Sequence, residues 1–139
     1  MKIPRKLIIG TAALVIAAGC APLPYAPIKL SSGLMTGNNG MTLYTFDKDA
    51  RATGRSECSG QCATNWPPLI AGDSDNSGGD WSVITRDDGR RQWAWLGKPL
   101  YYWSKDQKPG DTTGDNFNQT WHAVRPEPRD ISAGNMNGP

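Results

Sequence analysis

The sequence has few of the features that mark common classes of enzyme and nucleic-acid-binding protein. Its 139 residues include one histidine and three cysteines, and they contain no nucleophile elbow, P-loop or dinucleotide-binding glycine motif. No basic block is interleaved with aromatic residues, as nucleic-acid-binding surfaces require. After residue 19, no window longer than about ten residues has helical periodicity. The sequence therefore does not indicate nucleophilic catalysis, nucleotide chemistry, nucleic-acid binding or a helical domain.

The chain also lacks an apolar run long enough to span a membrane. Three basic residues precede the apolar run at 7–18, which is shorter than the roughly 20 residues of a membrane-spanning helix. The run ends in small residues directly before Cys20, which resembles a bacterial lipobox. We expect cleavage before Cys20 and palmitate or a similar lipid on this residue. Ala21 favours the outer membrane in a Gram-negative host, and an ordinary secretory signal is the alternative.

These features predict a domain organisation. Residues 1–19 form a signal peptide, and 20–27 form a proline-rich tether between lipid and domain. A duplicated domain follows at 28–126, and the Pro-, Gly- and Asn-rich tail at 127–139 is expected to be disordered. Removal of the basic signal leaves acidic and basic side chains nearly balanced. We therefore expect the membrane to be reached through the lipid.

A sequence phrase occurs twice in this domain. Residues 40–49 read GMTLYTFDKD and residues 97–106 read GKPLYYWSKD. Gly, Leu, Tyr, Lys and Asp recur in place, and Phe46 is replaced by Trp103. A second correspondence between the two copies places Trp66 and Trp121 at equivalent positions. Two copies of one unit in so short a chain predict a single pseudo-twofold domain.

The secondary structure expected for each copy is a hairpin, a long polar loop and a short strand. Residues 81–86 and 91–95 alternate in the manner of strands and flank an Asp-Gly turn. In the first copy, an Asn-Asn-Gly turn at 38–40 is expected to join strands at 28–36 and 42–46. The long loops lie at 49–65 and 105–119. The prediction is an all-β, loop-rich domain.

Cys58 and Cys62 form an even pair once Cys20 carries lipid. In an oxidising compartment, the expected outcome is a disulfide that fixes the first long loop. The alternative is a pair of thiolates that binds Cu(I) or takes part in thiol exchange, with His122 as a possible third ligand. His122 is otherwise expected to be a hydrogen-bonded packing residue, or a general base if a carboxylate lies nearby.

The repeated motif Y-x-[F/W]-x-x-D places its tyrosine and its second ring on one side of a strand. Asp49 and Asp106 follow where each strand should end, which favours local capping of an Asx-type turn. A hydrolytic pair of carboxylates is the sharper alternative, since glycosidases use two acids about 5 to 10 Å apart.

Aromatic residues supply the remaining candidate binding groups. The full candidate set is Tyr44, Phe46, Asp49, Trp93, Trp95, Tyr101, Trp103, Asp106 and His122. Most of the rings are expected in the core of a domain this small. Exposed members of the second repeat, Trp93, Trp95, Tyr102 and Trp103, would instead form a platform that stacks on an envelope glycan or a protein partner.

In combination, the doubled motif, Cys58-x3-Cys62 before Trp66-Pro-Pro-Leu69, and Pro109-Gly-Asp with Trp121-His122 resemble a family of bacterial predicted lipoproteins. This family is described as a secreted repeat of unknown function. The resemblance covers roughly residues 40–126 and implies export and duplication, but no reaction. We therefore expect a non-enzymatic, lipid-anchored envelope module without a cofactor, with copper binding or thiol exchange as the alternative.

Overall fold

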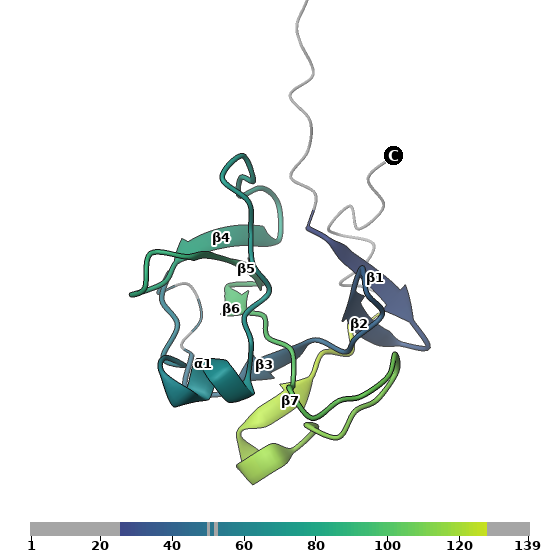
Figure 1. The fold of residues 1–139 in the computed structure, drawn as a ribbon. Helices are drawn as coiled ribbons and strands as arrows, with labels where there is room; N and C mark the ends of the chain where they lie inside the picture. The colour runs from purple at the N-terminus through teal and green to yellow at the C-terminus, as the bar shows by residue number, and fades with distance from the viewer. Residues whose placement is uncertain (1–25, 50, 52, 128–139) are drawn as a thin grey trace, which may run out of the picture.

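The computed structural model describes residues 26–49, 51 and 53–127. The signal peptide, most of the tether and most of the tail predicted above lie outside these residues. Within them the chain forms strands joined by long loops, with one short α-helix and one 3₁₀ turn (Figure 1). The elements are β1 Ile28–Ser31, β2 Leu34–Gly37, β3 Tyr44–Phe46, α1 Gln61–Asn65, β4 Trp81–Thr85, β5 Arg91–Trp95, β6 Lys98–Pro99, η1 Phe117–Gln119 and β7 Trp121–Ala123. The predicted all-β, loop-rich class is confirmed.

The hairpin predicted in the second copy is present. β4 pairs antiparallel with β5, so that Trp81 lies opposite Trp95 and Thr85 lies opposite Arg91. Gly89 adopts φ of 82° in the connecting turn, a conformation that favours glycine. β6 then pairs with the other edge of β5 and completes a three-stranded sheet.

The first copy differs from the prediction, because residues 28–36 do not form one strand. Ser32 and Gly33 both have positive φ, 51° and 77°, and together they make a tight turn that folds β1 back on β2. The expected turn at 38–40 is also formed, and a bridge between Thr36 and Thr42 follows it. The first copy therefore begins with two successive turns, at 32–33 and 38–40, rather than one.

Backbone hydrogen bonds join the two copies at two equivalent places. β3 of the first copy pairs with β7 of the second (Figure 1). In this pairing Phe46 lies opposite Trp121. In return, the amides of Tyr102 and Ser104 donate to the carbonyls of Pro67 and Asn65 at 2.7 and 2.9 Å. Each repeat is therefore completed by backbone hydrogen bonds from the other repeat.

Two clusters of buried side chains form the core. One lies under β1, β2 and β4–β6, and it includes Met35, Leu43, Trp93 and Leu100. The other lies around β3 and β7 and consists mainly of aromatic rings. Its buried residues are Tyr44, Phe46, Cys58, Trp66, Tyr101, Trp103, Trp121 and Ala123. This second cluster contains both copies of the repeated motif.

Candidate functional site

The tyrosines of the two repeated motifs lie opposite each other at the centre of the molecule. Tyr44 and Tyr101 form an antiparallel bridge, in which each amide donates to the carbonyl of the other residue at 2.8 and 3.0 Å. Both side chains are fully buried. Because the two residues are repeat equivalents, the pseudo-twofold axis passes between them.

Each tyrosine binds the aspartate of the other repeat. The hydroxyl of Tyr44 donates to Asp106 Oδ2 at 2.7 Å, and the hydroxyl of Tyr101 donates to Asp49 Oδ2 at 2.6 Å. Both carboxylates are buried, with 3% of Asp49 and 8% of Asp106 exposed. Each of these hydrogen bonds crosses from one repeat to the other, so the two pairs join the repeats.

The second oxygen of each carboxylate holds the long loop that follows it. Asp49 Oδ1 accepts the amide of Glu57 at 2.7 Å. Asp106 Oδ1 accepts the amide and the hydroxyl of Thr113 at 3.0 and 2.6 Å. The expectation of a local Asx turn is therefore corrected, since these acceptors reach several residues further along the loop. The structure shows two separate Tyr–Asp pairs in place of two free acids.

Burial shifts the proton affinities of these pairs. Desolvation, reinforced by the hydrogen bond and the charge of Asp106, raises the pKa of Tyr44 well above its ordinary value. Desolvation and Asp49 raise the pKa of Tyr101 in the same way. Desolvation also raises the pKa of Asp49, although the hydrogen bonds from Tyr101 and the Glu57 amide oppose this effect. Both phenols therefore hold their protons firmly.

Four aromatic rings form a continuous stack across the pseudo-twofold axis. The central pair, Trp66 and Trp121, has ring centroids 3.8 Å apart and nearly parallel planes. Phe46 stacks on Trp121 at 4.2 Å, and Trp103 stacks on Trp66 at 4.0 Å. Phe46 is the repeat equivalent of Trp103, so the stack has the symmetry of the sequence repeat.

The two tyrosines meet this stack edge-on. Tyr44 contacts Trp66 at a centroid distance of 5.4 Å, and Tyr101 contacts Trp121 at 5.2 Å. Edge-to-face and offset-stacked pairs are the favourable geometries for aromatic rings. At the ends, Lys48 lies 6.0 Å from the Phe46 ring and Lys105 lies 5.6 Å from the Trp103 ring. The lysines are exposed and are again repeat equivalents.

The predicted disulfide between Cys58 and Cys62 is confirmed. Hydrogen bonds from Arg86, which is only 5% exposed, fix the loop that carries this disulfide. One Arg86 amino group donates to the carbonyl of Cys58 at 2.5 Å. The other donates to Ser56 Oγ at 3.0 Å and to Gln92 Oε1 at 2.6 Å. Because the sulfurs are bonded to each other, they cannot act as thiolate ligands in this state, as the copper alternative requires.

His122 lies on the surface, and its hydrogen-bond partner is Asp47 rather than a residue of the disulfide loop. Its Nε2 is 2.9 Å from Asp47 Oδ2, and both side chains are nearly half exposed. A carboxylate therefore lies within hydrogen-bond distance of His122, which is the condition stated above for a general base, but exposed pairs of this kind contribute little to stability. Within the part of the chain that the structure describes, no group of three or more potential ligands is placed to hold a metal ion.

Three of the four aromatic residues considered as a glycan platform are buried. Trp93 is fully buried, and Trp95 and Trp103 are 7% and 5% exposed. Trp93 and Trp95 pack in the first core cluster, and the half-buried Tyr102 packs against it. Alternation along β5 does place both tryptophans on one side, but that side faces the core. Trp93, Trp95 and Trp103 are therefore core residues, as expected for most of the rings, and the platform alternative does not hold for these three tryptophans.

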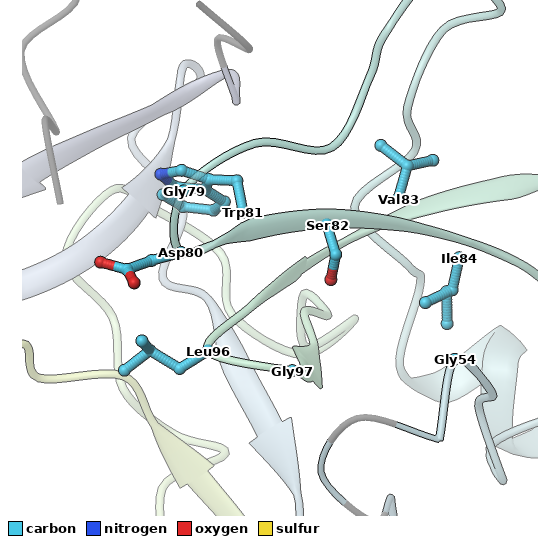
Figure 2. Close-up of a pocket in the computed structure, with 9 residues that line it drawn as sticks. All are labelled: Gly54, Gly79, Asp80, Trp81, Ser82, Val83, Ile84, Leu96 and Gly97. Atoms are coloured by element: carbon cyan, nitrogen blue, oxygen red, sulfur yellow. The ribbon is translucent and has the colours of Figure 1, made fainter.

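An open pocket of about 430 Å³ lies beside β4. Figure 2 shows Ser82 and Ile84 on one side of this strand and Val83 on the other, with Leu96 and Asp80 at one end of the pocket. Its lining contains none of the candidate residues predicted from the sequence.

Among the described residues, no helix has both the length and the apolar character needed to cross a membrane.

The comparison with protein families agrees with the duplication. The model of a family described as a secreted repeat of unknown function matches residues 31–70 and again residues 82–125. The chain belongs to this family. No curated protein and no solved structure is significantly similar to the chain. The match confirms the repeat and supports export, and the two matched segments contain the two tyrosines that meet on the pseudo-twofold axis.

Several residues of this site were not identified from the sequence. Arg86 and Ser56 lie far apart along the chain and outside the repeated phrase, so no local pattern links them. Trp66 and Trp121 were recognised as repeat equivalents, but their direct stacking was not. The signal that could have indicated it is the symmetry itself, because equivalent rings close to a twofold axis meet each other.

Proposed function

We propose that this chain is an exported lipoprotein of the cell envelope, anchored through lipid on Cys20 and facing the periplasm or the cell surface. Two facts support the proposal. The family is one of secreted repeats, and a short apolar run with small residues precedes Cys20. The outer membrane is the expected location in a Gram-negative host, because Ala21 does not favour retention in the inner membrane.

The folded domain acts as a non-enzymatic structural or binding module. The observation that carries this proposal is that the carboxylates and cysteines considered as reactive groups are bound to other groups of the same chain. Asp49 and Asp106 are buried against Tyr101 and Tyr44, and Cys58 and Cys62 are bonded to each other. These groups hold the two repeats together and fix the loops, and both carboxylates are buried.

An envelope protein or glycan is the expected partner of the module. The large apolar side chains that the described surface exposes are Leu30, Ile70 and Phe117. Phe117 also contacts the rings of Trp66 and Trp103, so a partner that covers it would contact the edge of the aromatic cluster. Single apolar residues of this kind are common on protein surfaces. They would indicate a binding surface only if a partner shields them from solvent in the native envelope.

Metabolic labelling with radioactive palmitate tests the anchor. The wild-type chain should carry the label and partition into a detergent phase, whereas Cys20→Ser should carry no label. The matched control is Cys58→Ser/Cys62→Ser, which keeps Cys20 and should remain labelled. A Cys20→Ser chain that is labelled as strongly as the wild type would refute anchoring at this residue.

The copper or thiol-exchange alternative is tested by counting thiols in the native envelope. Alkylation without reductant should leave Cys58 and Cys62 unmodified if the disulfide persists there. Modification of both residues would mean that the envelope keeps them reduced, and the thiol alternative would then replace the structural role of the pair.

A further inference from the structure

The aromatic cluster combines two features that matter for one-electron chemistry. Tryptophan and tyrosine are the side chains that lose a single electron most readily, and here they are in contact without interruption. Trp103, Trp66 and Trp121 stack face to face, and Tyr44 and Tyr101 touch the two central rings edge-on. An electron vacancy on any one ring can therefore move to a neighbour in direct contact.

The Tyr–Asp pairs supply the second feature, which is a place for the proton. A tyrosine that loses an electron becomes a very strong acid, so its oxidation is favourable only when the phenolic proton leaves as well. The hydroxyl of Tyr101 is already 2.6 Å from Asp49 Oδ2, and that of Tyr44 is 2.7 Å from Asp106 Oδ2. Each proton can cross an existing hydrogen bond without rearrangement. Burial also raises the pKa of Asp49, which makes its carboxylate a better base.

We propose that the aromatic core is a one-electron relay, in which the electron vacancy comes to rest on Tyr101 or Tyr44 and the phenolic proton moves to the aspartate of the other repeat. An external one-electron oxidant removes an electron from a tryptophan of the stack. Tyr101 returns an electron to that tryptophan, its O–H bond breaks, and the proton joins Asp49. The products are a neutral tyrosyl radical, a neutral Asp49 and the reduced oxidant. An external electron donor reverses the step, and the proton returns to the phenol.

The charges around the stack favour movement of the vacancy from the end rings toward the two tyrosines. Lys48 and Lys105 lie near the rings at its two ends, Phe46 and Trp103. A positive charge beside an end ring disfavours a vacancy there, whereas the carboxylates beside the tyrosines favour it at the centre. The exposed lysines also attract anionic molecules. The partner that fits these ends is therefore a small anionic oxidant or the acidic surface of a redox protein.

The test uses the purified full-length protein and hexachloroiridate(IV), an anionic one-electron oxidant. Rapid mixing followed by absorption and electron paramagnetic resonance spectroscopy should detect a neutral tyrosyl radical. Tyr44→Phe/Tyr101→Phe should lose this signal and retain a tryptophan radical. The matched control is Tyr102→Phe, because Tyr102 packs in the other core cluster, and its radical yield should equal that of the wild type. A signal that survives in the double variant and disappears in Tyr102→Phe would overturn the relay.

Two measurements on folded protein guard against misfolding of the double variant. Radical formation in wild-type protein should be slower in D₂O than in H₂O if the proton moves with the electron, and equal rates would contradict the coupling to aspartate. Lys48→Gln/Lys105→Gln should react more slowly with hexachloroiridate at low salt than Lys98→Gln, which changes a lysine on β6. Equal rates for these variants would contradict the attraction of the oxidant by Lys48 and Lys105.

Discussion

Tyr44 and Tyr101 are hydrogen-bonded to each other through their backbones and to opposite repeats through their side chains. This relationship explains why the motif Y-x-[F/W]-x-x-D is written twice. The tyrosine builds the axis, the second ring extends the stack, and the aspartate receives the tyrosine of the other copy. One copy alone has a tyrosine without its acceptor and an aspartate without its donor, so the motif is complete only as a pair.

The first prediction concerns the energetic coupling across this axis. Tyr101→Phe should lower the free energy of unfolding by about 1–3 kcal/mol, because it leaves the buried Asp49 carboxylate short of a donor. In a double-mutant cycle with Asp49→Asn, the two effects should not add, since both remove the same hydrogen bond. Urea denaturation gives all the values required. Strict additivity would show that the bond contributes nothing measurable.

The second prediction concerns alkaline stability. The folded state raises the pKa of Tyr44 and Tyr101, whereas an unfolded tyrosine ionises near its ordinary value of about 10. Their contribution to stability is therefore fully present below that pH and is lost as pH rises above it. Tyrosinate absorbance from these two residues should appear together with the loss of circular dichroism. In Tyr44→Phe/Tyr101→Phe this shared step should be missing, and ionisation well before unfolding in the wild type would contradict the burial of the phenols.

The part of the structure that could be predicted from sequence is local or symmetric. The β4–β5 hairpin follows from alternation around an Asp-Gly turn, and the Cys58–Cys62 disulfide follows from two nearby cysteines in a chain whose sequence predicts export. The pairing of β3 with β7 could not be predicted in this way, because strand register between distant segments depends on packing that no local pattern records. The same limit explains why Asp49 was expected to cap its own turn. Its true partner, Tyr101, lies in the other repeat.

The third prediction uses Gly114, which lies against the stack. A β-carbon at this position would be 2.8 Å from the Trp66 ring and 3.0 Å from the Trp103 ring, closer than side chains can approach. Gly114→Ala should therefore displace a ring and lower the free energy of unfolding by about 1–3 kcal/mol. Gly72→Ala is the matched control, because its nearest neighbour would be 3.6 Å away. Near-ultraviolet circular dichroism, which reports ring packing, should change for Gly114→Ala alone.

The fourth prediction separates two arginines of the same hairpin. Arg86 is buried and binds Ser56, Gln92 and the Cys58 carbonyl, whereas Arg90 forms an exposed pair with Asp88. Arg86→Met should leave buried acceptors unpaired and cost at least about 2 kcal/mol. Arg90→Met should change stability by no more than about 0.5 kcal/mol. Thermal melts of the two variants side by side would decide the matter, and equal shifts would contradict a structural role for Arg86.

The last prediction concerns what the disulfide contributes. It closes a ring of only a few residues, so the loop-entropy model assigns it less than the roughly 3 kcal/mol of a fifteen-residue loop. Arg86 and Asp49 hold the same loop through the Cys58 carbonyl and the Glu57 amide. Reduction should therefore lower the urea midpoint while leaving the domain folded, and amide exchange should accelerate mainly around residues 56–66. Cys58→Ser/Cys62→Ser should show the same lowered midpoint with and without reductant. Global unfolding on reduction would mean that the buried hydrogen bonds cannot hold this loop by themselves, and the disulfide would then be essential to the fold.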